Sequence, residues 1–165
     1  MITVLVAEDH PLVRRGIIGF LSTQPDLAVV AEAGDGAEAL RLATEHHPDV
    51  ALVDLQLPRI DGVETIRRLT RDCPGTRVVV LTSHESDADV LPAIHAGALS
   101  YLLKEAMPDE LAAAVRSAAA GEACCIPGWR PGSSPSCGPD GRRRPTRCAI
   151  SPSASWRCCG YSARG

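Results

Sequence analysis

The sequence predicts an α/β fold in which a doubly wound parallel sheet of five strands occupies residues 1–121. Five short apolar runs alternate there with five stretches in which apolar residues recur at helical spacing. Near-continuous apolar runs are typical of parallel strands that helices bury on both faces. Residues 122–165 lack this pattern, and we expect them to form a disordered tail.

The first strand is expected at residues 2–7, a run rich in β-branched residues that is too short for a helix. A helix follows up to residue 21, and Pro11 suits its first turn, where an N–H would have no helical partner. Arg14 and Arg15 lie opposite the apolar positions of this helix. We interpret them as a solvated face or a partner contact.

The second strand is expected at residues 27–33, and a helix follows that ends near residues 46–48. Asp35 is placed to cap this helix, with Glu38 three residues later as the capping-box partner. The third strand is expected around residues 51–53, with Asp54 at its end and Pro58 stopping the extended segment.

The remaining elements continue the alternation. They are a helix at 61–71, a strand at 77–81, a helix at 87–96, a strand at 99–103 and a helix at 108–120. Pro92 weakens the fourth helix because it lacks an N–H. Helical connections of this length between parallel strands should be right-handed.

A sharp change in composition marks the domain boundary near Gly121. Residues 1–122 hold 19 acidic and 10 basic side chains, whereas residues 123–165 hold seven Arg and one Asp. The second segment has no Leu, Val, Phe, Met or Lys, so it cannot bury enough apolar area to offset the entropy of ordering it. We therefore expect a folded domain at residues 1–121 and a tail at residues 122–165.

Six of the seven cysteines lie in the tail, but the N-terminus argues against a secreted, disulfide-rich protein. Residues 1–7 lack the basic start of a signal peptide, and two acidic residues follow at once. No apolar run approaches the length of a membrane span. We expect a cytoplasmic protein without membrane contact, in a compartment where disulfides are rare.

Polar residues follow four of the expected strands. They are Glu8 and Asp9 after the first, Asp54 at the third, Thr82 at the fourth and Lys104 at the fifth. In a parallel sheet these ends share one edge, where ligands collect. Neighbouring carboxylates repel one another unless a cation joins them, and oxygen ligands suit Mg²⁺. A hydroxyl and a fixed positive charge complete a site suited to a phosphorylated carboxylate.

Residues 1–121 resemble a CheY-like response-regulator receiver domain. The stretch Asp54-Leu55-Gln56-Leu57-Pro58-Arg59-Ile60-Asp61-Gly62 matches the phosphoacceptor motif D-x-x-x-P-x-x-D-G. The acidic pair, the Thr after the fourth strand, and an aromatic three residues before the Lys occur in the same order. The resemblance implies a flavodoxin-like (βα)5 fold with strand order 2-1-3-4-5. Tyr-Leu-Leu-Lys-Glu at 101–105 resembles the NarL/FixJ subfamily, whose usual output domain is a LuxR-type helix-turn-helix.

The same resemblance implies a role for each strand-end residue. Asp54 would accept a phosphoryl group from a sensor histidine kinase. The implied Mg²⁺ ligands are Glu8, Asp9, Asp54 and the backbone carbonyl of Gln56, and the implied phosphate-binding residues are Thr82 and Lys104. Thr82 and Tyr101 would move inward on phosphorylation, remodel the face made by the fourth helix, fifth strand and fifth helix, and allow a homodimer.

Two functions from other classes fit the same sheet. A phosphatase that passes through a phospho-Asp would use the same carboxylates and Lys104, but a haloacid-dehalogenase type would need a second Asp where the chain has Gln56. A flavodoxin would need a Ser- and Thr-rich phosphate loop after the first strand, where Glu8 and Asp9 would repel the FMN phosphate. We therefore expect a signalling module and no enzyme.

Residues 122–165 show no helix-turn-helix pattern, but the codons that could encode them permit one in another reading frame. The segment 155–162 can be encoded AGC-TGG-AGG-TGC-TGC-GGC-TAC-TCG, and reading from the third base gives L-E-V-L-R-L-L. With L-T-x-R-E permitted upstream, this string resembles the opening helix of a LuxR-type domain. We hypothesise that the tail is an off-frame translation, by frameshift or by sequencing error. DNA is then a partner only if an in-frame helix-turn-helix exists.

Overall fold

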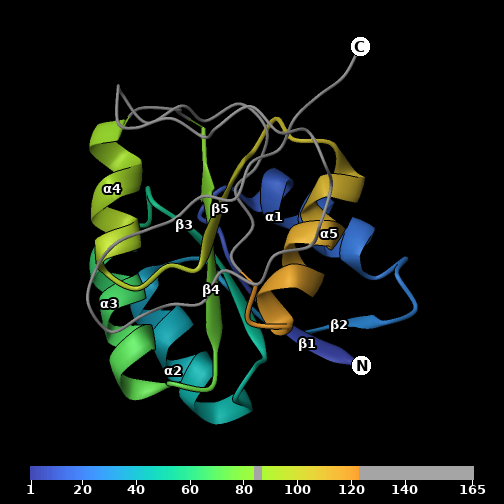
Figure 1. Cartoon of the computed structure of the whole chain (residues 1–165), viewed down its shortest axis with the longest axis horizontal. Coiled ribbons are helices and arrows are strands. Elements are labelled where there is room, and N and C mark those ends of the chain that lie inside the picture. Colours follow the sequence, from blue (N-terminus) through green and yellow to red (C-terminus); the bar gives the residue numbers. More distant parts are fainter. Residues whose placement is uncertain (84–86, 123–165) are drawn as a thin grey trace, which may run out of the picture.

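The computed structural model of the chain describes residues 1–83 and 87–122, so the expected tail falls almost entirely outside the described residues (Figure 1). The strands are β1 (Ile2–Ala7), β2 (Leu27–Ala33), β3 (Val50–Asp54), β4 (Arg77–Thr82) and β5 (Ser100–Leu103). The helices are α1 (Pro11–Leu21), α2 (Gly36–His46), α3 (Gly62–Asp72), α4 (Asp87–His95) and α5 (Pro108–Ala119).

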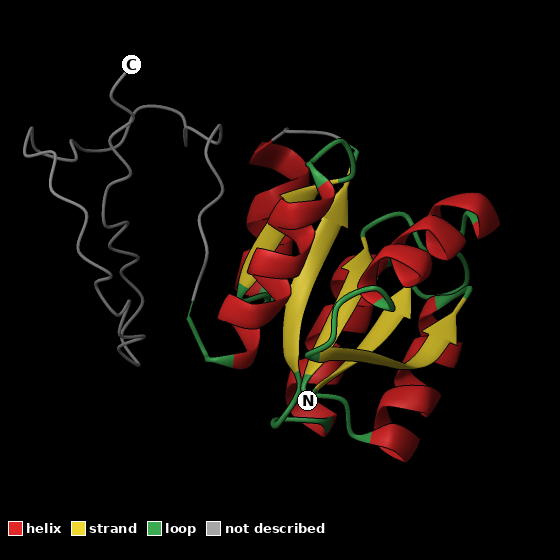
Figure 2. Ribbon diagram, turned by 90° about the vertical axis from the view of Figure 1, so that its right-hand side faces the viewer, coloured by secondary structure: helices red, strands yellow, loops and turns green. Residues whose placement is uncertain are grey.

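The five strands form one parallel sheet in the order β2-β1-β3-β4-β5, which confirms the predicted fold and strand order. Helices cover both of its faces, with α1 and α5 on one and α2, α3 and α4 on the other (Figures 1 and 2). The central strand, β3, is buried along its whole length. Its end pairs with β1 through Val53 and Ala7, and with β4 through Asp54 and Leu81. Asp54 therefore lies between the ends of β1 and β4.

Two apolar layers fix the strands between the helices. One layer joins the sheet to α2, α3 and α4 and includes Leu5, Val53, Ile66 and Leu69. The other joins it to α1 and α5 and includes Leu21, Leu52, Leu102 and Val115. Burying one such side chain contributes about 1.5–3 kcal/mol relative to leaving it exposed. The strand ends that carry the polar residues are thus held by packing on both faces.

Two features of the structure differ by one residue from their predicted positions. Helix α3 begins at Gly62 rather than at 61, because Asp61 keeps an extended backbone (φ −61°, ψ 161°) and caps the helix. At α2, Asp35 accepts the Glu38 N–H at 2.9 Å as predicted. The Glu38 carboxylate, however, accepts the N–H of Gly34 rather than that of the capping residue.

Helix α4 ends at His95, close to the expected end at residue 96, and Gly97 follows with a φ of +111°, which favours glycine. Among the helices in the described ranges, none is both long and apolar enough to cross a membrane.

Candidate functional site at the carboxyl edge of the sheet

The three predicted carboxylates meet at one edge of the sheet. Glu8 directly follows β1, Asp9 comes next, and Asp54 ends β3 beside it. One oxygen from each of the three lies within 4.8 Å of the others. Glu8 is fully buried and Asp54 is 2% exposed, whereas Asp9 faces solvent. The site is therefore a cluster of three carboxylates of which only Asp9 is exposed.

Lys104 enters this cluster from the adjacent strand. It follows β5, and its backbone N–H donates to the Thr82 carbonyl at 2.8 Å. Its ammonium donates to Asp54 Oδ2 at 2.8 Å and to Glu8 Oε1 at 2.9 Å. A single lysine thus links the ends of β1 and β3 from the far side of β4.

Burial and pairing act against each other on these charges. Burial raises the pKa of the Glu8 carboxyl above its usual value, and the nearby Asp54 carboxylate adds to that rise, while the Lys104 hydrogen bond opposes it. Burial would lower the pKa of the Lys104 ammonium, but its hydrogen bonds to Asp54 and Glu8 outweigh burial and raise it. Lys104 is therefore a permanent positive charge in the site.

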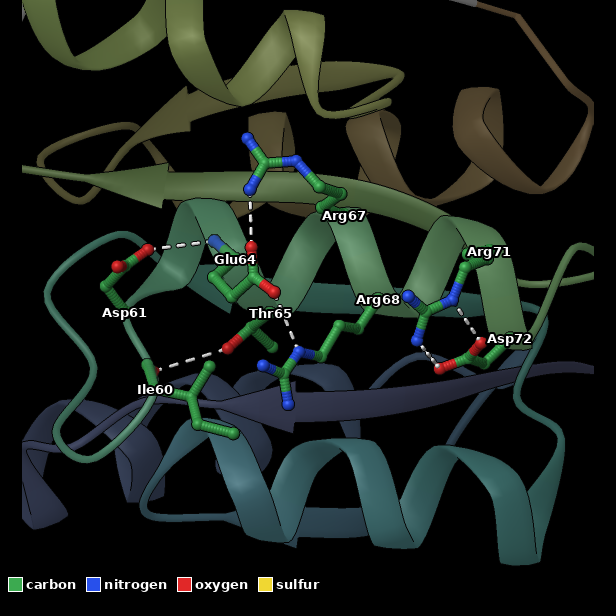
Figure 3. Close-up of polar contacts among 8 residues, drawn as sticks. All are labelled: Ile60, Asp61, Glu64, Thr65, Arg67, Arg68, Arg71 and Asp72. Atoms are coloured by element: carbon green, nitrogen blue, oxygen red, sulfur yellow. Dashed lines mark hydrogen bonds and ion pairs between the residues drawn. The ribbon is translucent and has the colours of Figure 1, made fainter.

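The loop between β3 and α3 folds back onto Asp54. The Gly62 N–H donates to the Leu55 carbonyl at 3.1 Å. A Cβ at position 62 would overlap the Asp54 carbonyl oxygen and the Leu55 backbone, so only glycine fits there. Asp61 accepts the Glu64 N–H at 2.8 Å, and the Thr65 hydroxyl donates to the Ile60 carbonyl at 3.3 Å (Figure 3). The D-G pair of the motif thus closes the loop that follows the central carboxylate.

The outer surface of α3 carries a run of ion pairs away from this loop (Figure 3). Glu64 pairs with both Arg67 and Arg68, and Arg71 pairs with Asp72. These pairs are largely solvated, and such pairs contribute little to stability.

Gln56 and Thr82 also lie at this edge, whereas Tyr101 lies further back in β5. The Gln56 N–H donates to Asp54 Oδ1 at 3.2 Å, so the turn after Asp54 keeps Gln56 close to it. Thr82 ends β4 and is 4% exposed, and it pairs in register with Leu103, the residue before Lys104. Tyr101 is 5% exposed and belongs to the apolar layer that includes Ala93 and Ala96.

One sequence interpretation is wrong in part. Arg15 is exposed, as expected, but Arg14 is not a solvated residue, because its side chain is only 21% exposed. Its guanidinium Nη1 donates to the Glu8 backbone carbonyl at 2.7 Å. This contact could not be predicted from the sequence, because it depends on how α1 packs against the ends of β1 and β2.

The donor set fits a divalent cation. Three carboxylates face a single ammonium, so the cluster keeps an excess of negative charge. Glu8 Oε2 is buried and accepts no well-aligned hydrogen bond from the described residues, although the Lys104 ammonium lies 2.8 Å away. Carboxylate oxygens suit Mg²⁺, which binds one or two carboxylates and keeps several waters.

Known proteins share both the sequence and the fold of this domain. Residues 4–116 match the family model described as the response regulator receiver domain. The transcriptional regulatory protein LiaR of Bacillus subtilis (strain 168) is 48% identical over 122 residues, which cover 74% of this chain and 58% of LiaR. The nitrate/nitrite response regulator NarL of Escherichia coli (strain K12) is 39% identical over 73% of this chain and 56% of NarL. The chain thus spans little more than half the length of these relatives.

Solved structures of response regulators have the same fold as this domain. The signal receiver domain of the putative response regulator NarL from Mycobacterium tuberculosis superposes with a TM-score of 0.71 at 39% identity. The superposition covers 73% of this chain and 98% of that one. A LuxR-family two-component response regulator from Aurantimonas sp. SI85-9A1 gives a TM-score of 0.73 at 36% identity, over 77% of this chain and 91% of that one.

Proposed function

Because the chain belongs to the response-regulator receiver family, whose general function is to accept a phosphoryl group, we propose that Asp54 is the phosphoacceptor and a sensor histidine kinase the donor. The observation that carries this proposal is the pairing of Asp54 Oδ2 with the Lys104 ammonium at 2.8 Å, beside two further carboxylates. That arrangement gives a carboxylate nucleophile at an open edge, next to a fixed positive charge for the transferred group.

Receiver domains bind Mg²⁺ at an acidic site, and we assign its ligands here to Glu8, Asp9, Asp54 and the Gln56 carbonyl. When bound, the ion would supply positive charge that offsets the repulsion between the carboxylates and an incoming phosphoryl group. The Gln56 N–H donates to Asp54 Oδ1 at 3.2 Å, so the chain itself holds one oxygen of this carboxylate.

In the proposed transfer, an oxygen of the Asp54 carboxylate forms a bond to phosphorus while the bond from phosphorus to the kinase histidine nitrogen breaks. The electron pair stays on the imidazole, which takes a proton from solvent. The Lys104 ammonium and the Thr82 hydroxyl bind the oxygens of the transferred group, because Thr82 ends the strand next to Asp54 and Lys104 reaches Asp54 from β5.

Phosphorylation at the carboxyl edge of the sheet would also produce the output of the signal. We assign the switch to Thr82 and Tyr101, which lie at the end and in the middle of neighbouring strands β4 and β5. Engagement of the Thr82 hydroxyl by the phosphoryl group would alter the packing of α4, β5 and α5 and promote a homodimer. Receiver domains are signalling modules, so we expect no catalytic turnover.

LiaR is named as a transcriptional regulatory protein, and we propose transcription control in the cytoplasm as the final output. The DNA-binding part would come from the shifted reading frame inferred above, which falls outside the described residues. Sequencing the gene across codons 120–165 tests this. An open frame that encodes a helix-turn-helix supports it, and a shifted frame interrupted by stop codons rejects it.

Phosphorylation with acetyl phosphate and Mg²⁺ tests the main proposal. We expect one acid-stable, base-labile phosphoryl group per chain in the wild type and none in Asp54→Asn. Asp72→Asn is the matched control, because it removes an exposed carboxylate from the far end of α3 and should label fully. Labelling of Asp54→Asn would overturn the assignment, and repeated turnover of acetyl phosphate would support the phosphatase instead.

A further inference from the structure

Arg14 connects α1 to the acidic end of β1. Its Nη1 donates to the Glu8 carbonyl oxygen at 2.7 Å, and its Nε lies 3.4 Å from Glu32 Oε2 at the end of β2. The Arg14 side chain is 21% exposed. Arg15, the next residue of the same helix, is exposed and, within the described part of the chain, forms no hydrogen bond or ion pair with the cluster. The two arginines therefore carry the same charge, but only Arg14 contacts Glu8 and Glu32.

The carbonyl that Arg14 holds belongs to the peptide between Glu8 and Asp9. Two other groups of Glu8 have partners of their own: its N–H donates to the Ala33 carbonyl at 3.1 Å, and its Oε1 accepts the His10 N–H at 3.2 Å. Asp9 is different. Within the described residues, no hydrogen bond or ion pair holds its carboxylate. The position of its Cα and the direction of its Cα–Cβ bond are therefore set by the backbone that leads into it.

The geometry points to Arg14 as a positioning residue for the metal site, an inference that rests on the proposed Mg²⁺ binding of that site. The guanidinium fixes the Glu8–Asp9 peptide so that both carboxylates face Asp54, and this orientation sets the affinity for the ion. Residues that orient metal ligands from outside the coordination shell commonly change affinity when they are replaced. Arginine suits the task because its planar fork reaches a carbonyl and a carboxylate at once.

Mn²⁺ provides a direct probe of binding, because it prefers the same oxygen ligands as Mg²⁺ and its free form is counted by electron paramagnetic resonance. We expect Arg14→Met to weaken Mn²⁺ binding about tenfold. Arg15→Met is the matched control and should bind as the wild type does, since it removes an equal charge without touching Glu8. Arg14→Gln keeps a polar side chain but is too short to reach the carbonyl, and should resemble Arg14→Met.

Acetyl phosphate labelling separates positioning from chemistry. In Arg14→Met the Mg²⁺ concentration for half-maximal labelling should rise about tenfold. The rate at saturating Mg²⁺ should stay within about twofold of Arg15→Met, because Asp54 and Lys104 are unchanged.

The outcomes distinguish this inference from the proposed function. If the wild type binds no Mn²⁺ and takes no label, the proposed function fails. If the wild type does both and the Arg14 variants bind Mn²⁺ as Arg15→Met does, only the positioning role is overturned. Loss of the native circular dichroism spectrum in both Arg14 variants would also overturn it, because Arg14 would then be required for folding.

Discussion

The Lys104 ammonium lies 2.8 Å from Asp54 Oδ2, although the two residues are 50 positions apart in the chain. Lys104 reaches across the end of β4 from β5, so this contact exists only when the order β3-β4-β5 is formed. The pairing therefore reports on the fold and the site together. It also leaves Asp54 with a counter-charge before any phosphoryl group arrives.

Replacing Asp54 should change the titration of Lys104 in a defined direction. Burial alone lowers the pKa of the ammonium, and the hydrogen bonds to Asp54 and Glu8 raise it above 10.5. Asp54→Asn removes one of these charges, so we expect the pKa of Lys104 to fall. Lys104 is the only lysine of the 165-residue sequence, so ¹⁵N-lysine labelling gives a single ammonium signal to follow by NMR. An unchanged or higher midpoint in Asp54→Asn would contradict the pairing.

The buried carboxylate of Glu8 should make stability depend on pH. Its pKa in the folded chain is raised above the ordinary 4.5, because burial penalises the charge. The stability it contributes is therefore fully present below pH 4.5 and is lost as pH rises through the folded pKa. Glu8→Gln removes this loss, so its stability relative to wild type should increase from pH 4 to neutral pH, with EDTA present. Urea unfolding followed by circular dichroism measures the difference, and a constant difference would refute the effect.

The glycine of the D-G pair should tolerate no side chain. Gly62→Ala places a methyl group against the Asp54 carbonyl and the Leu55 backbone, neither of which can move aside without distorting the site. We expect a loss of about 2–3 kcal/mol in the free energy of unfolding, together with slower labelling by acetyl phosphate.

Gly16→Ala is the control for that substitution. Position 16 lies within α1, and an added Cβ meets no atom within 4 Å. Alanine is the better helix former, so this variant should gain about 0.5–1 kcal/mol. Urea midpoints of the two variants should lie on opposite sides of the wild type. A Gly62→Ala protein as stable as Gly16→Ala would show that the loop does not close on Asp54 as described.

The strands were predictable because they depend on local sequence, and the convergence of the site was predictable because the carboxyl ends of parallel strands share one edge of the sheet. A continuous apolar run such as residues 51–53 defines a buried strand, and a parallel sheet then brings Glu8, Asp54 and Lys104 to one edge without further information. The role of Arg14 was not predictable. Its helical position marks it as polar, but its contact with the Glu8 carbonyl depends on the angle at which α1 crosses the sheet. The shift of the Glu38 hydrogen bond to Gly34 likewise depends on the path of the backbone between β2 and α2.

At the opposite edge of the sheet, Asp49 and Thr3 join the starts of β3 and β1. Asp49 Oδ2 accepts the N–H and the hydroxyl of Thr3, both at 2.8 Å, and the Thr3 hydroxyl accepts the Asp49 N–H at 3.0 Å. The backbone hydrogen bond from Thr3, followed by that from its hydroxyl, holds the pKa of Asp49 below 3.8. The stability from this pair is therefore present above pH 3.8 and lost as pH falls through the lower, folded pKa.

Asp49→Asn should consequently lose about 0.5 kcal/mol at pH 7, a small value because the pair is exposed to solvent. The difference from wild type should shrink as pH falls below 3.8, where the native carboxylate becomes protonated as well. Thr3→Val removes the hydroxyl and completes a double-mutant cycle, in which the coupling between the two positions should be favourable at pH 7 and smaller in acid. Equal losses for Asp49→Asn at both pH values would show that the carboxylate charge contributes nothing to this junction.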